Sequence, residues 1–411
     1  IINLQIGDCD MSGIIDIDCG IKIGNAINPP DGDKKGPITI KTLIIIVGIG
    51  LVVLFVAIGG FLMFMNTPDA PVTGIYDIKI DFALVNHTIG ENCTMRVVEI
   101  THVGGESVEN VSTLYVLPYI PEQFEINLID RVIPVYEKSL KHFREGEKIY
   151  LYLGVDGMFH LGGDMPNEDD FVDFPDGDYM ISVEDARYNR GIAQYNFTIE
   201  DSHTLLVHDD KTITSAIRNS DDHESILVYG DLYKERLRID KPVRIFAVNR
   251  AIIDGGNLEA VVLVTASDAH IQGFNIKNSG SGEFIDGGIV IQSPARNVKI
   301  IDNEIQRCSS GVWIWQSNMN EIYNNYIHNN DHNGIWIQNG HNNDIRYNML
   351  YNNKYGLHVE SGEYNYIVEN KFTGNKLYGI YIPNWVHLKN VCEYNDLGED
   401  KHEFGKIVTR E

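Results

Sequence analysis

The stretch GVWIWQSNMNEIYNNYIHNNDHNGIWIQNG, from Gly311 to Gly340, decides the fold of the C-terminal half of this 411-residue chain. It holds three of the four tryptophans, and Trp313 and Trp336 each lie two residues after a glycine, 23 positions apart. The glycines continue at intervals of 22 or 23, at Gly288, Gly311, Gly334, Gly356 and Gly379. A short repeat of β-branched strands with Gly and Asn in its turns is typical of a solenoid.

Asparagine follows the same period in two columns. The first has the frame I-x-x-N-x-I/L/F, with Cys392 replacing the first isoleucine of the last copy; it consists of Asn303, Asn325, Asn348, Asn370 and Asn395. The second consists of Asn330, Asn353 and Asn375. Each copy has the length of one coil of a parallel β-helix, stacked about 4.8 Å above the last. Asparagines stacked at bends can hydrogen-bond along their column, and asparagine tolerates a left-handed backbone.

The segment before the repeat carries a family resemblance. TITSAIRNSDDHESILVYGDLYKERLRIDKPVRIFAVNRAIIDGG (212–256) and IQGFNIKNSG (271–280) resemble the first coils of the NosD-like and pectate-lyase-like right-handed β-helix family. The matching residues are Val228, Gly230, Tyr233, Glu235, Leu237, Ile239, Lys241 and Pro242. This resemblance implies a right-handed β-helix over residues 204–411 with a short capping helix. It does not select a function, because the architecture serves lyases, hydrolases, epimerases, adhesins and a copper-enzyme maturation factor.

Strand alternation predicts which side chains leave the coil. In G-V-W-I-W, Val312 and Ile314 are expected to point inward, and Trp313 and Trp315 outward. Exposed aromatic rings in a row can stack on the apolar faces of sugar rings. The residues predicted to bind carbohydrate are therefore Trp313, Trp315, Trp336, His358 and Tyr381. Two alternatives are that the rings stabilise the coil by stacking on one another, or that a loop or another domain covers them.

Glu360 and His358 are the candidate catalytic residues, since a carboxyl group and an imidazole on one face suit acid–base chemistry on a glycan. The neighbours of Glu360 in its column are Gln338 and Pro383, so no second carboxylate accompanies it. Binding is therefore favoured over a polysaccharide lyase, glycosidase or epimerase. No cofactor or metal site is predicted. The histidines nearest in sequence are expected on different sides of the coil, without a Met or Cys cluster for Cu(I): His328, His332 and His341.

The N-terminal region predicts a membrane anchor. Leu43 to Met65 is free of charge and long enough to span roughly 30 Å of hydrocarbon. Lysines precede it, so positive-inside bias predicts a cytoplasmic tail at 1–36, a single-pass anchor helix at 37–66 and extracytoplasmic domains beyond. The anchor has no A-x-A site after it and is expected to stay uncleaved. The net charge of −25 argues against a nucleic-acid partner.

Residues 67–203 alternate apolar and polar residues in short runs, which predicts an antiparallel β-sandwich. VVEITHVGGESVENVSTLYV (97–116) resembles the archaeal pilin-type domain, in which an I-T-H-x-G-G-D/E turn joins two strands behind a hydrophobic helix. The resemblance implies an archaeal surface protein. Pro37 and Lys41 depart from the start of a pilin helix, so a monomeric stalk is favoured over filament assembly.

Asparagine has a different role in each domain. Between residues 67 and 200, four of seven asparagines begin N-x-S/T sequons, whereas none of the 26 from residue 211 onward does. The sequence therefore predicts glycosylation at Asn86, Asn92, Asn110 and Asn196. It predicts, as a whole, an extracytoplasmic membrane protein whose β-helix binds polysaccharide, with a carbohydrate-active enzyme on the same fold as the alternative.

Overall fold

The computed structural model describes residues 78–89, 93–107, 114–119, 133–134, 142–185, 190–208, 211–282, 286–386 and 389–404. The predicted cytoplasmic tail and anchor helix lie outside these ranges, as do Asn92 and Asn110. Within the ranges, the structure contains no helix with the length and hydropathy needed to cross a membrane.

Two antiparallel sheets form the region before the repeat. One has the order β1 (Lys79–Ile89), β2 (Cys93–Gly104), β5 (Lys148–Gly154), β6 (Phe159–Gly162), and β7 (Phe171–Val172) also pairs with β5. The other has the order β4 (Ile133–Pro134), β3 (Leu114–Tyr119), β8 (Gly177–Asp185), β9 (Arg190–Ile199). Burial alternates along β2 except at Val97 and Val98, which are both buried, and Ile100 shares a core cluster with Ile181 of β8. The antiparallel strands follow from the period of two in the sequence. Asn86 and Asn196 are exposed on β1 and β9.

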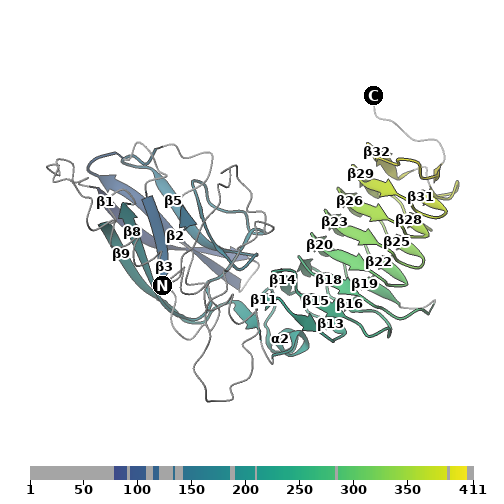
Figure 1. Cartoon of the computed structure of the whole chain (residues 1–411), viewed down its shortest axis with the longest axis horizontal. Helices are drawn as coiled ribbons and strands as arrows, with labels where there is room; N and C mark the ends of the chain where they lie inside the picture. Colours follow the sequence, from purple (N-terminus) through teal and green to yellow (C-terminus); the bar gives the residue numbers. More distant parts are fainter. Residues whose placement is uncertain are drawn as a thin grey trace, which may run out of the picture. The chain divides into compact units, whose positions relative to one another are not determined.

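The repeat folds into stacked coils that contribute strands to three parallel sheets (Figure 1). Sheet 1 consists of β10 (Thr204–Val207), β11 (Ser225–Tyr229), β14 (Arg244–Val248), β17 (His270–Gln272), β20 (Lys299–Ile301), β23 (Glu321–Tyr323), β26 (Asp344–Arg346), β29 (Tyr366–Val368) and β32 (Val391–Glu393). Sheet 2 consists of β12 (Leu232–Tyr233), β15 (Ile252–Asp254), β18 (Asn275–Lys277), β21 (Glu304–Gln306), β24 (Tyr326–His328), β27 (Met349–Tyr351) and β30 (Lys371–Thr373). Sheet 3 consists of β13 (Leu237–Ile239), β16 (Val262–Val264), β19 (Gly287–Gln292), β22 (Ser310–Trp315), β25 (Asn333–Gln338), β28 (Tyr355–Val359), β31 (Tyr378–Ile382) and β33 (His402–Phe404). The predicted parallel β-helix is confirmed.

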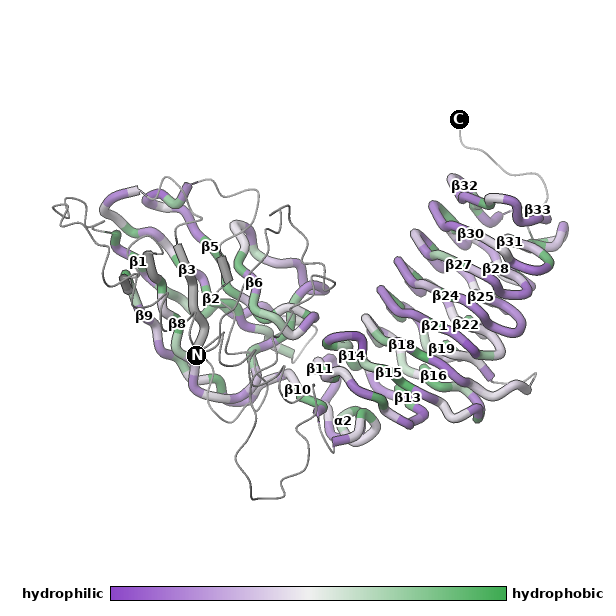
Figure 2. Tube along the Cα trace, in the orientation of Figure 1, coloured by the Kyte–Doolittle hydropathy of each residue, from purple (hydrophilic) through white to green (hydrophobic). Residues whose placement is uncertain are grey.

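A continuous apolar core runs through the coils. The central residue of each short strand points inward, and the inward residues of successive coils align in register, as Ile322, Ile345 and Ile367 do in sheet 1. These three side chains have 0% exposure. Figure 2 shows hydrophobic residues along the strands and mostly hydrophilic turns between them. Burying an aliphatic side chain in this way contributes about 1.5–3 kcal/mol, so the core supplies most of the stability of the coils.

Two residues of the family motif, Glu235 and Lys241, form hydrogen bonds with the ends of the short helix α2 (Ile213–Asn219). Glu235 accepts hydrogen bonds from the backbone N–H groups of Ile213 and Thr214, both at 3.0 Å. Lys241 donates to the backbone oxygens of Arg218 (3.1 Å) and Ser220 (2.5 Å), at the opposite end. The free backbone groups at both helix ends are thereby satisfied. The motif thus serves to fix α2, whose buried Ile213 belongs to the core of the coils.

Asparagine ladders occupy three corners of the coil. In the two predicted columns, the backbone N–H and side-chain amide of one asparagine donate to the side-chain oxygen of the next; for Asn325 and Asn348 these distances are 2.9 and 3.0 Å. The second column ends on Asp400, which accepts from Asn375. A third column, absent from our sequence prediction, consists of Asn320, Asn343, Asn365 and Asn390.

The left-handed residue at these corners is not the ladder asparagine, contrary to the sequence expectation. The residue immediately before it has the positive φ instead, for example Asn324 (53°), Tyr347 (57°) and Glu369 (57°). The left-handed residue turns the chain so that the following asparagine points into the corner, where it is shielded from water. Asn348 has 0% exposure. The asparagines therefore serve as buried hydrogen-bonding groups, and several residue types take the strained backbone position.

Candidate functional site

The aromatic residues of the repeat gather on the outer face of sheet 3. The strand register pairs Trp313 with Val290 on one side and Trp336 on the other. Trp336 pairs in turn with His358, and His358 with Tyr381. The rings contact one another continuously. We call this set the aromatic row; it consists of Trp313, Trp315, Trp336, Tyr355, His358, Tyr378 and Tyr381.

Tyr355 and Tyr378 belong to the row although sequence reasoning missed them. Both precede the repeat glycine by one residue, and the Tyr355 ring lies 5.3 Å from His358. Simple alternation counted back from His358 would send Tyr355 inward. The strand departs from alternation at Gly356, because Gly356 and Leu357 are both buried. A Cβ on Gly356 would lie 2.5 Å from the oxygen of Gly379, so only glycine lets successive coils approach this closely. The sequence signal that could have identified these two residues is an aromatic residue directly before the repeat glycine.

The row has a closed end and an open end. Trp313 stacks on Trp336 with ring centroids 4.6 Å apart and planes inclined by 12°, and on Trp315 at 5.5 Å and 17°. At the other end Tyr381 is inclined to its neighbours, by 54° to His358 and by 39° to Tyr378, whereas Tyr355 and Tyr378 stack nearly parallel, with centroids 6.0 Å apart and planes inclined by 6°. Nearly parallel rings cover each other's faces, whereas tilted rings leave part of each face uncovered. We call Tyr355, His358, Tyr378 and Tyr381 the open end, because all four are partly exposed and Tyr381 is tilted against its neighbours.

The burial of Trp313 corrects the sequence prediction. Trp313 leaves the coil on the outer side, as alternation predicts, but it is only 4% exposed. Ala260, Val290 and the partly buried Trp315 and Trp336 pack around it. Its indole N–H has no acceptor within the described part of the chain. Trp313 therefore presents no open ring face to a ligand, and it packs against Trp315 and Trp336 at the closed end of the row. Trp336 and the remaining members are partly exposed.

Carboxylates fix the rings of the row. Glu360 accepts hydrogen bonds from the indole N–H of Trp336 (3.1 Å) and from the side-chain amide of Gln338 (3.2 Å). A hydrogen bond to Glu403 raises the pKa of Tyr378. Burial lowers the pKa of His358, against the opposing effect of Glu360, so this imidazole stays neutral at neutral pH. Glu360, the candidate catalytic acid, thus already has two donors and serves to orient Trp336.

The histidines considered for metal binding lie apart from one another. His328 contacts Glu304 at 3.0 Å on sheet 2, His332 contacts Ser309 at 3.3 Å, and His341 accepts from the backbone N–H of Glu363 at 3.1 Å. Across the described ranges, no group of three or more His, Cys, Asp or Glu side chains is arranged to hold a metal ion.

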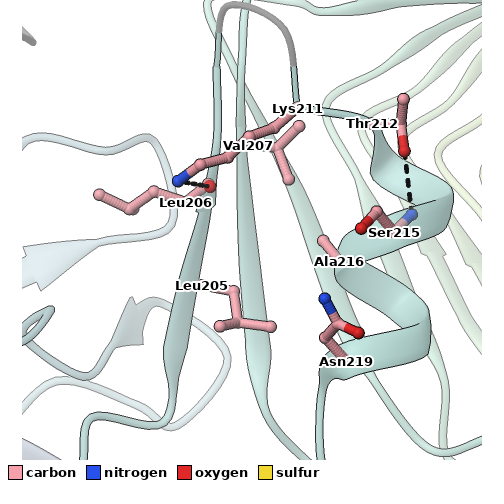
Figure 3. Close-up of a pocket in the computed structure, with 8 residues that line it drawn as sticks. All are labelled: Leu205, Leu206, Val207, Lys211, Thr212, Ser215, Ala216 and Asn219. Carbon is pink, nitrogen blue, oxygen red and sulfur yellow. Dashed lines mark hydrogen bonds between the residues drawn. The ribbon is translucent and has the colours of Figure 1, made fainter.

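A pocket of about 410 Å³ lies between β10 and α2 (Figure 3). Two of its polar groups have partners in the protein: the Thr212 hydroxyl accepts from the Ser215 backbone N–H at 3.1 Å, and Lys211 donates to the Leu206 oxygen at 3.4 Å. Leu205 and Ala216 line it as partly buried residues packed against the core. Lys211 is the one titratable side chain among the residues that line it, so this pocket is a weaker candidate than the aromatic row.

Comparison with known proteins supports the fold. Residues 242–392 match the family model of the right-handed beta helix region. Among curated proteins, none matches the chain. Solved structures with a similar fold include the periplasmic alginate epimerase AlgG (TM-score 0.30, 19% identity, covering 48% of this chain and 45% of that chain). Another is an alginate lyase from Paenibacillus sp. str. FPU-7 (0.33, 17%, 47% and 75%). A third is the catalytic domain of a GH87 alpha-1,3-glucanase in complex with nigerose (0.37, 12%, 80% and 74%).

The chain spans less than half the length of the epimerase, and all three TM-scores are low. These neighbours act on polysaccharides, but at this level of similarity their activities and substrates do not transfer to the present chain. The family match, together with the three parallel sheets, establishes the architecture. Residues 242–392 form a right-handed parallel β-helix.

Proposed function

We propose that the protein is a membrane-anchored, extracytoplasmic surface protein whose β-helix binds polysaccharide through the open end of the aromatic row. The supporting observation is a set of partly exposed rings, with Tyr381 tilted against its neighbours, held on a parallel sheet by ring contacts and by the hydrogen bond from Tyr378 to Glu403. Flat π surfaces suit the apolar faces of sugar rings, and exposed aromatic patches usually mark a binding partner. Parallel strands lie about 4.8 Å apart, so a saccharide chain running along the sheet can meet rings from successive coils.

The alternative is a carbohydrate-active enzyme on the same fold. Its support is Glu360, a carboxylate beside the rings of the row, with His358 two residues before it on the same strand face. Glu360 accepts hydrogen bonds from two protein side chains, Trp336 and Gln338. The next position in its column is Pro383, so no second carboxylate lies there. A binder is therefore preferred. Product analysis after prolonged incubation with any bound glycan distinguishes the two, since an enzyme would shorten or epimerise it.

The binding site is tested with Tyr381→Ala in the full chain, solubilised in detergent and screened on a glycan array. For the strongest hit, we expect an affinity loss of about 5- to 150-fold, taking the magnitude of aromatic–base stacking, roughly 1–3 kcal/mol. Tyr366→Ala is the matched control, because it removes an exposed tyrosine from sheet 1 instead. Equal affinity of both variants and the original protein would refute the proposed site.

Membrane anchoring and glycosylation remain proposals based on the apolar segment 43–65 and the sequons. The apolar segment leads us to propose a single-pass topology with residues 67–411 outside the cytoplasm. Asn86 and Asn196 are exposed on their strands, as an acceptor must be. Protease added to intact host cells should therefore remove the β-helix, and intact-mass analysis should find glycans on the stalk alone. A protected β-helix would rule out this topology.

The archaeal pilin-type resemblance of residues 97–116 enters the proposal only as a description of the stalk. A monomeric stalk is preferred over a filament, because Pro37 and Lys41 depart from the start of a pilin helix. Size-exclusion chromatography of the detergent-solubilised chain distinguishes them, since a filament would elute in the void volume.

A further inference from the structure

Two carboxylates lie beside partly exposed rings of the aromatic row. Glu360 lies beside Trp336, and Glu403 pairs in register with Tyr381 while accepting a hydrogen bond from Tyr378. Both glutamates are partly exposed. A glutamate carries a negative charge at neutral pH, so a ligand that covers these rings also meets fixed negative charge.

One cation offsets this charge within the row. The Lys354 ammonium lies 5.9 Å from the centroid of the Tyr355 ring. Lys376 and Lys401, on the adjoining turns, are exposed to solvent, where their charge is screened. Among the described charged side chains that contact the rings, two are glutamates and one is a lysine, so an anionic ligand is disfavoured where it meets Glu360 and Glu403.

The same carboxylates suit uncharged sugars. An ionised carboxylate offers about four lone-pair sites for hydrogen bonds, and the described partners of Glu360 are two donors, on Trp336 and Gln338. Sugar hydroxyl groups can donate to the remaining sites, with the added strength of a charge-assisted bond. A uronate at neutral pH instead brings a second carboxylate, which has no proton to donate and is repelled at short range.

We propose that the aromatic row selects an uncharged polysaccharide and rejects polyuronates. This inference rests on the proposed function and adds the chemical class of the ligand. The rings supply affinity that is indifferent to charge, and Glu360 and Glu403 supply the discrimination. The selectivity is a difference between two affinities, to which both the gained hydroxyl contacts and the repulsion contribute.

The test is a glycan array built of pairs that differ only in the group at C6, such as galactan with galacturonan and mannan with mannuronan. The full chain in detergent should bind the neutral member of any recognised pair about tenfold or more tightly than the acidic member. Salt at about 0.5 M should narrow this gap, because screening weakens the repulsion.

Glu360→Gln keeps an acceptor oxygen for Trp336 and removes the charge, while its new amide group faces Gln338, whose side-chain amide can turn its oxygen toward it. It should narrow the gap about threefold or more, chiefly by improving binding of the acidic member, while leaving thermal unfolding unchanged. Glu393→Gln is the matched control, since it removes a carboxylate from sheet 1. Equal or tighter binding of the acidic members would overturn the inference and leave polysaccharide binding intact. Failure to bind any pair would overturn both.

Discussion

Replacing Asn348 by alanine should lower the free energy of unfolding of the β-helix by about 3 kcal/mol or more. The Asn348 side-chain oxygen accepts from the backbone and side chain of Asn325, and its amide donates to the oxygens of Ile322 (2.7 Å), Arg346 (3.0 Å) and Asn370 (3.0 Å). Alanine would leave several of these buried groups without a partner. Each buried unsatisfied group costs roughly 1–3 kcal/mol.

Tryptophan fluorescence during denaturant unfolding measures this effect specifically, because all four tryptophans lie in the β-helix. Lys371→Ala is the control, as an exposed residue on β30 of a neighbouring coil. A surface substitution of this kind should change stability by about 0.5 kcal/mol or less. If Asn348→Ala were equally mild, water would have to replace the lost hydrogen bonds, and the ladders would not be essential to the fold.

Trp313→Ala should cost about 3–5 kcal/mol, the range for a large aromatic residue removed from a core. This tryptophan is 4% exposed and stacks on both Trp315 and Trp336. Its removal opens a cavity and uncovers both neighbours. The cost should match that of Ile337→Ala, about 2–5 kcal/mol, although Ile337 points into the coil and Trp313 points out of it.

Thermal and denaturant unfolding of both variants, with Trp313→Phe as a more conservative change, checks this prediction. Phenylalanine retains an aromatic ring and removes the indole N–H that lacks an acceptor, so it should recover most of the loss. A cost for Trp313→Ala of about 1 kcal/mol or less would mean that the tryptophan is accessible. The row would then extend to the closed end, and its contribution to glycan binding would be measurable in the same variant.

The period of the repeat was sufficient to predict the architecture. Inward isoleucines such as Ile322 and Ile345 recur with the coil, and only a parallel stack lets every copy bury the same face against its neighbour. Two of the three asparagine ladders were predicted from the same period. The third has the same kind of spacing as the first, and both end on an interval of 25 residues, from Asn365 to Asn390 and from Asn370 to Asn395, so the sequence contains its signal as well.

Other features depended on contacts that a local pattern does not contain. Alternation along a strand determines the side on which a side chain leaves it, and so it assigned Trp313 and Trp336 to the same outer face. Whether that side chain is then accessible depends on residues from other coils, such as Ala260 and Val290 around Trp313. The tilt between Tyr381 and His358 and the hydrogen bond from Trp336 to Glu360 also depend on residues from different coils. The sequence by itself therefore determined the coil and the face of the residues that follow strict alternation, because both follow from local periodicity; Tyr355 and Tyr378, next to the repeat glycines, depart from it. Only the tertiary structure decided which rings are buried and which remain open, because burial is a property of neighbours brought together by stacking.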